Sequence, residues 1–87
     1  MKYVFHPDAE DELVAAIDYY EDCELGLGYD FAIEVHSTIE NILSYPKAWP
    51  TLEDYIRRCQ TRRFPYGIIY VIREVKGTVV PFKYLNI

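Results

Sequence analysis

The residues of this chain best suited to binding chemistry are four arginines grouped in the range 57–63: Arg57, Arg58, Arg62 and Arg63. A guanidinium group is always charged, and its planar N–H donors match carboxylates and phosphates. Burying such a group without a partner is costly. A strand that carries these arginines must therefore turn at least one face to water, an anion or a partner, and we look for function there.

Two tyrosines, Tyr66 and Tyr70, come directly after the arginines, and Lys83 and Tyr84 lie near the end of the sequence. Aromatic rings beside arginines would suit single-stranded RNA, whose bases stack on such rings. Both groups also have a structural interpretation. The tyrosines sit among apolar residues, which favours packing at the edge of a core, and the arginines could pair with carboxylates of the same domain.

The other reactive side chains form no recognisable catalytic or metal-binding motif. His6 and His36 lack the clustered partners that a metal site needs. Cys23 and Cys59 are neither a disulfide framework nor a zinc motif, so we interpret them as reduced thiols. The sequence contains no glycine-rich phosphate loop, and no Ser-His-Asp or Cys-His arrangement can be argued. We therefore expect no cofactor and no metal.

Charge is divided unevenly along the chain. Residues 1–56 hold 13 acidic and 2 basic side chains, a net charge of −11, whereas residues 57–87 hold 7 basic and 1 acidic, a net charge of +6. Such asymmetry indicates a charged partner for one half, or acidic helices that neutralise a basic sheet. The total of −5 makes long-range attraction to nucleic acid weak.

The elements that position the arginines are predicted to be β-strands. Gly67 and Pro65 interrupt two runs rich in Ile, Val and Tyr, a pattern typical of a β-hairpin. A second turn is expected at Lys76-Gly77, and Pro81, which cannot donate to a ladder, predicts an edge strand or a bulge. The predicted strands span about 56–64, 67–74 and 78–84.

The first half of the chain is predicted to be mainly helical. A short strand at Lys2–Phe5 precedes a helix that starts at Pro7, a residue favoured at the first helical position. The sequence Leu-Gly-Leu-Gly at 25–28 should end it, and a second helix should run from about 29 to 44. Residues 46–53 are expected to be a loop whose Trp49 plugs the core edge. The expected core residues are Leu13, Ile17, Phe31, Val35, Ile39 and Ile42.

Together these elements predict an α+β fold with the order β-α-α-β-β-β, a helical hairpin packed on an antiparallel sheet. The 87 residues are expected to form a single domain, 1–87. No apolar run approaches the roughly 20 residues that span a bilayer, so no membrane partner is expected. The N-terminus lacks the apolar region of a signal peptide, and we expect a cytoplasmic protein.

The order and spacing of several motifs resemble the ParE/RelE family of type II toxin–antitoxin toxins, most closely its ParE-like, plasmid-stabilisation branch. The similarity covers about residues 2–80. The motifs that carry it are Phe5-His6-Pro7 with Ala9, Glu12 and Leu13, Asp18-Tyr19-Tyr20, Gly26-Leu27-Gly28 with Phe31, Tyr45-Pro46, Trp49-Pro50, Arg63-Phe64-Pro65-Tyr66 and Ile69-Tyr70.

The resemblance implies one of two activities. ParE-like members bind and inhibit DNA gyrase, whereas RelE-like members cleave messenger RNA on the ribosome without a metal. Members of both branches are neutralised by a cognate antitoxin whose extended segment wraps the toxin. The residues expected to contact the target or antitoxin are Arg57, Arg58, Arg62, Arg63, Tyr66, Tyr70, Lys83 and Tyr84.

The C-terminal sequence departs from the family pattern. Many relatives continue into a His or similar residue, Arg-rich sequence and a Pro-x-Tyr-Trp end, whereas Tyr84 here lies near the usual His and only Leu85-Asn86-Ile87 follows. We therefore expect a protein-binding toxin rather than an enzyme. The alternatives are a ribosome-dependent endonuclease and a truncated toxin that binds only its antitoxin. Either Arg62 or Arg63 matches the family's strand arginine, since a one-residue slip changes the face.

Overall fold

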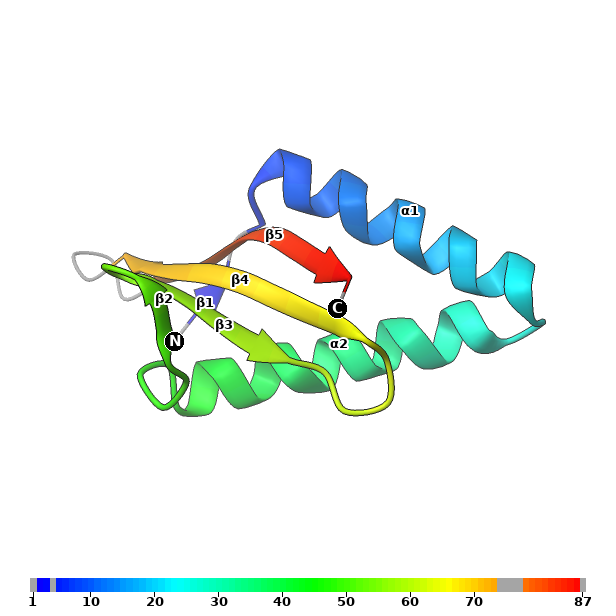
Figure 1. Ribbon diagram of the computed structural model, residues 1–87. Helices are drawn as coiled ribbons and strands as arrows, with labels where there is room; N and C mark the ends of the chain where they lie inside the picture. The colour runs from blue at the N-terminus through cyan, green and yellow to red at the C-terminus, as the bar shows by residue number, and fades with distance from the viewer. Residues whose placement is uncertain (1, 4, 74–77, 87) are drawn as a thin grey trace.

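The computed structural model describes residues 2–3, 5–73 and 78–86, with side chains described at 3 and 5–72. It is an α+β structure in which two helices pack on one five-stranded sheet of order β1-β5-β4-β3-β2 (Figure 1), and the predicted fold class is confirmed. The elements are β1 (Lys2–Tyr3), α1 (Pro7–Cys23), α2 (Leu27–Ser44), β2 (Thr51–Glu53), β3 (Ile56–Gln60), β4 (Tyr66–Arg73) and β5 (Thr78–Asn86).

Helix α1 begins where the sequence predicts, with Pro7 in its first turn. His6 is the N-cap residue, and its Nδ1 accepts a hydrogen bond of 3.2 Å from the amide of Asp8. Asp8 and Glu10 lie in the first turn, where negative charge is favourable at the positive end of the helix dipole. His6 thus has a local structural role.

The connection between the helices is shorter than predicted, because Leu27 and Gly28 belong to α2. Gly26 adopts a left-handed conformation (φ 89°) and is the N-cap of α2 rather than the C-terminal cap of α1. Gly28 lies inside the first turn, and a Cβ atom there would stand 2.6 Å from the carbonyl oxygen of Ile17. Glycine at 28 is therefore required for close approach of the helices.

One carboxylate of α1 fastens this connection. Glu21 accepts hydrogen bonds from the amides of Gly26 (2.9 Å, Oε2) and Gly28 (3.0 Å, Oε1). These amides belong to the first turn of α2, whose N–H groups have no partner within the helix. A single side chain thus caps α2 and joins it to α1.

The sheet combines an antiparallel meander with one parallel strand at its edge. β3, β4 and β5 pair antiparallel in sequence order, and β1 pairs parallel with β5 at Thr78 and Val79. Ile69 pairs with Lys83 but Tyr70 pairs with Pro81, so Phe82 is an extra residue in β5. The bulge expected near Pro81 is confirmed, whereas the predicted turn at Lys76-Gly77 lies outside the described residues.

Two predictions about strand boundaries are wrong. The strand predicted over 56–64 ends at Gln60, and the chain bends over 62–65. The loop predicted over 46–53 contains a fully exposed three-residue strand, β2, which pairs antiparallel with β3. β2 was missed because three exposed residues give no measurable alternation. Asp54 completes the turn to β3 with a positive φ of 48°.

Both helices cover the same face of the sheet. Residues Ile68 and Tyr70 of β4 lie fully buried in one cluster with Phe31 and Ile42 of α2. Trp49 packs against this core cluster while partly exposed, as predicted. Of the expected core residues, Phe31, Val35, Ile39 and Ile42 are buried, and Leu13 and Ile17 pack against the cluster while partly exposed.

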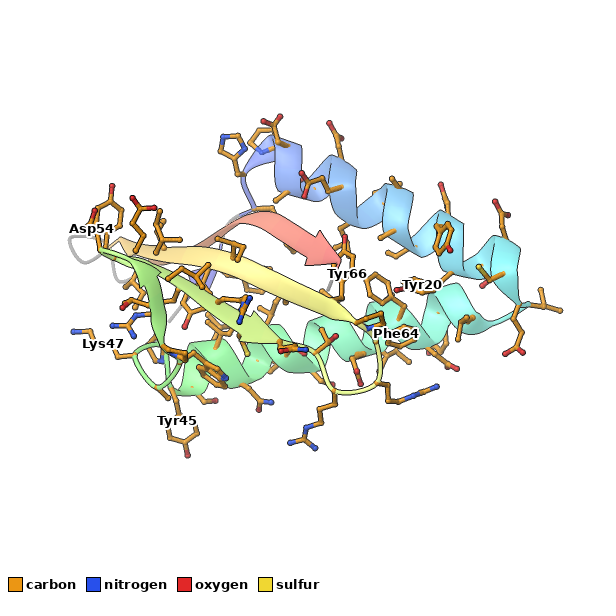
Figure 2. All side chains as sticks on the ribbon, viewed as in Figure 1. Tyr20, Tyr45, Lys47, Asp54, Phe64 and Tyr66 are labelled. Atoms are coloured by element: carbon orange, nitrogen blue, oxygen red, sulfur yellow. The ribbon has the colours of Figure 1, made fainter. Side chains whose placement is uncertain are left out.

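Aromatic rings close the core near the joined ends of the helices. Tyr20 of α1 lies 4.7 Å from Phe31 and 4.9 Å from Phe64 between ring centroids, and Phe31 lies 5.0 Å from Tyr66. Figure 2 shows Tyr20, Phe64 and Tyr66 grouped beside the beginning of β4. The Tyr20–Phe64 and Phe31–Tyr66 contacts are edge-to-face, an arrangement that adds to the stabilisation from buried area.

Replacing Ile39 by Ala should lower the free energy of unfolding by about 2–4 kcal/mol, because a buried side chain would leave a cavity. Urea unfolding followed by circular dichroism measures this change. Ile33 lies on the same helix but is 47 % exposed. Ile33→Ala is the matched control and should change stability far less, so equal losses in the two variants would contradict the assigned helix faces.

Gly28→Ala should destabilise the protein by about 1–3 kcal/mol, because the added methyl group would press on the α1 backbone. The sign of the change in the free energy of unfolding is informative, because Gly→Ala inside a helix ordinarily stabilises by about 0.5–1 kcal/mol. Thermal unfolding of Gly28→Ala beside Ser37→Ala, an exposed site on α2, measures the difference. A raised midpoint for Gly28→Ala would contradict the close approach seen here.

Candidate functional site

The four arginines do not share one strand. Arg57 and Arg58 lie on β3, whereas Arg62 and Arg63 lie in the bend between β3 and β4. Thr61 forms this bend, because its hydroxyl donates to the carbonyl oxygens of Phe64 (2.8 Å) and Tyr66 (3.0 Å). The prediction of one strand with four arginines is therefore wrong, and each arginine has its own environment.

Arg57 is used to hold the loop after α2. Its Nη1 donates to the carbonyl oxygens of Trp49 (2.5 Å) and Lys47 (3.2 Å). Backbone carbonyls of a loop need such donors when no strand partner supplies them. Arg57 thus has a structural role that accounts for its charge.

Arg63 is tied to α2. Its backbone amide donates to Glu34, and its guanidinium lies 3.9 Å from Asp30 and 5.5 Å from the ring centroid of Phe64. Both carboxylates project from the first half of α2. The ion pair between Arg63 and Asp30 is an example of the predicted neutralisation of helix carboxylates by the basic half of the chain.

Arg58 and Arg62 remain as candidates for external contacts. In the described part of the chain neither guanidinium has a hydrogen-bond or ion-pair partner, and Arg62 is exposed. Arg58 pairs with Ile69, which alternates with the core residues Ile68 and Tyr70 and so lies on the face opposite the helices. Ile69 is nevertheless only 4 % exposed, so this face has an apolar centre beside a charge.

A polar groove of about 620 Å³ separates α2 from β3, and Arg62 is one of its walls. Its lining is mainly hydroxyl, amide and carboxylate groups with a Trp side chain. The lining residues are Glu34, Ser37, Thr38, Glu40 and Asn41 of α2, with Trp49, Cys59, Gln60 and Arg62. A groove of this size and polarity fits a segment of polypeptide better than an apolar small molecule.

Two of the predicted binding residues belong to the core instead. Tyr66 is 7 % exposed and Tyr70 is completely buried, with its hydroxyl donating to the carbonyl oxygen of Pro46 (2.8 Å). Burial raises the pKa of each phenol to about 12. Their assignment to a binding surface is corrected, because both face the helices. The predictions for the side chains of Lys83 and Tyr84 lie outside the described residues.

The thiol and imidazole groups of the described residues do not assemble into a reactive site. Burial raises the pKa of the Cys59 thiol to about 11, which keeps it protonated and unreactive at neutral pH. His36 lies 3.5 Å from Glu40, one turn away on α2. Over the described ranges no three His, Cys, Asp or Glu side chains are placed to hold a metal ion.

Sequence reasoning missed a set of exposed apolar side chains. They lie on the helices, in the helix connection, in the loop after α2 and in the β2–β3 hairpin: Val14, Tyr19, Leu25, Tyr29, Ile33, Tyr45, Leu52 and Tyr55. Figure 2 shows Tyr45 pointing away from the molecule. For those on the helices, a position outside the helical apolar stripe is the sequence signal that marks them. No helix in the described ranges is long and apolar enough to cross a membrane.

Comparison with known proteins gives a match in structure only. No protein-family model and no curated protein matches the chain. A chain of a solved structure described as "Chromosomal ParDE TA system from P. aeruginosa" superposes with a TM-score of 0.81 at 12 % sequence identity. The match covers 100 % of this chain and 96 % of that chain. The fold that the sequence resemblance implied is therefore confirmed as the fold of a chain from a ParDE system.

Proposed function

We propose that this protein is the toxin component of a type II toxin–antitoxin module and that it acts by binding proteins. The observation that carries the proposal is the ParE-like fold together with two arginines, Arg58 and Arg62, whose charge the described residues do not neutralise. The other two arginines of the cluster are engaged within the domain. The unengaged pair lies on and beside β3, next to a polar groove.

The partner expected at this surface is an acidic segment of a cognate antitoxin. Guanidinium groups form charge-assisted hydrogen bonds with carboxylates, and these are stronger than neutral ones. A partner of about 30 residues could bury a standard interface of about 1,600 Å². For the cellular target we propose a protein of the gyrase type, as the sequence resemblance implies for the ParE-like branch.

Protein binding is favoured over RNA cleavage by the placement of the two histidines, the side chains that most often transfer protons near neutral pH. Catalysis on a ribose hydroxyl needs a group that accepts a proton beside cations that stabilise the phosphate. Both histidines belong to the helical layer: His6 caps α1 and His36 is on α2. Neither accompanies Arg58 on the opposite face of the sheet.

Co-expression with the product of the adjacent small reading frame should give a stable complex with a raised thermal midpoint. Replacing Arg58 and Arg62 together by Glu should weaken the complex at least tenfold, because two attractive contacts become repulsive. Isothermal titration calorimetry measures the affinity. The control is the double Lys variant, which keeps both charges and should bind far better than the Glu variant.

Purification of the protein without the neighbouring product, and no calorimetric signal when that product is added, would contradict the proposed function. Retention of wild-type affinity by the Glu variant would instead remove the two arginines from the interface. Circular dichroism of each variant establishes that the fold is intact, and little change is expected because neither guanidinium has a partner within the described domain.

Induced expression should not produce codon-phased cleavage of translated messages, as measured by primer extension. Cells should instead show the arrest of DNA replication expected when gyrase is inhibited. Message cleavage that disappears on changing Arg58 and Arg62 to Ala would contradict the binding proposal and support the ribosome-dependent endonuclease.

A further inference from the structure

The outer edge of β3 carries backbone groups that the sheet does not use. Thr61 donates its amide to Tyr66 of β4 (2.9 Å), whereas the amide of Arg58 donates away from β4, to Pro50 (3.4 Å). Backbone groups of successive residues in an antiparallel strand point alternately to the two sides. The N–H and C=O of Gln60 therefore point away from β4.

No strand within the described ranges covers this part of the edge. β2 pairs with β3 only at Ile56 and Arg57, and Pro50 contacts Arg58 just before β2 begins. Among the described residues no other group satisfies the Gln60 amide. The Gln60 carbonyl accepts only a long contact from the Cys59 thiol (4.0 Å). An exposed strand edge of this kind is a template for another chain.

The open edge forms one side of the groove beside α2. Cys59, Gln60 and Arg62 stand on the sheet side, and Ser37 and Asn41 stand on the helix side. The sheet side of the groove, from Cys59 to Arg62, is four residues long and measures at most about 13 Å at about 3.3 Å per residue. The space therefore suits a short extended peptide lying along β3.

We propose that the open edge of β3 at Gln60 accepts an extended segment of the partner polypeptide as an added strand in the groove between α2 and β3. This inference rests on the proposed function and adds the mode of recognition. The Gln60 N–H and C=O supply the first pair of hydrogen bonds. The remainder of the partner's interface lies elsewhere, because about four residues bury only a fraction of a standard interface.

Charges around the groove set the sequence that the added strand must carry. Its side chains alternate between the two faces of the sheet. Those directed to the helix side meet Glu40, Ser37 and Asn41, so a basic or amide side chain fits there. Those directed to the opposite side meet Arg58, where an acidic side chain fits. The recognised segment thus alternates acidic with basic or amide residues.

Gln60→Pro tests the backbone contact directly. Proline removes the amide hydrogen and places its ring at the outer edge, yet costs no hydrogen bond to β4 because this N–H points outward. We expect the affinity for the co-expressed product of the neighbouring reading frame to fall at least tenfold. Gln60→Ala is the matched control, since it removes the side chain but keeps the amide, and should bind within about twofold of wild type.

A second measurement needs no substitution. Hydrogen exchange followed by NMR should show the Gln60 amide exchanging freely in the isolated protein and protected at least tenfold in the complex. The Thr61 amide donates to Tyr66 in the isolated protein and serves as the internal reference, protected in both states. Glu40→Lys should weaken binding as well, whereas the same charge change at the exposed Asp18 of α1 should weaken it less.

The outcomes separate the two proposals. Loss of affinity in Gln60→Pro together with protection of the Gln60 amide supports strand addition. A complex in which that amide still exchanges freely overturns strand addition and leaves the proposed function standing, even where the proline variant fails to fold. Absence of any complex with wild-type protein overturns both.

Discussion

The contact of Gly28 with the backbone of α1 is the constraint on which the arrangement of the helices depends. The absence of a side chain at this position lets α2 begin within van der Waals distance of Ile17, and the Glu21 carboxylate holds the first turn of α2 in place. From that fixed start α2 runs along the sheet to Ser44 and passes β3. The groove, its acidic wall and the pairing of α2 with Arg63 all follow from this direction. A side chain at 28 would collide with Ile17 and Glu21 of α1.

The two helices and the existence of the last three strands could be predicted because their signals are repeated over many residues, whereas the order of the strands in the sheet could not. Phe31, Val35, Ile39 and Ile42 recur at helical spacing and are buried. The candidate site beside β3 could not be predicted residue by residue. Thr61 ends β3 through two hydrogen bonds of its hydroxyl, a local interaction that a period of two cannot reveal. The predicted strand continued past Thr61 and therefore included Arg62 and Arg63, which lie in the bend after β3.

The charge asymmetry of the sequence has two structural outcomes. Arg63 is neutralised internally by Asp30 of α2, and Arg57 donates hydrogen bonds to loop carbonyls. Arg58, in contrast, lies beside the apolar Ile69. Counting charges in each half predicted both possibilities and could not assign residues to them. The assignment depends on which side of β3 each residue occupies, and alternation along a strand makes neighbours such as Arg57 and Arg58 opposite in role.

The parallel pairing of β1 with β5 has a consequence for the order of events during synthesis. Lys2 and Tyr3 find their strand partners at Thr78 and Val79, so the earliest element of the sheet can be incorporated only after the latest one. Contacts between such distant segments are formed late, since the intervening chain must first be ordered. A ribosome-bound chain that has not yet released β5 therefore lacks the completed sheet. Any property that needs all five strands therefore arises only after β5 has emerged and paired with β1.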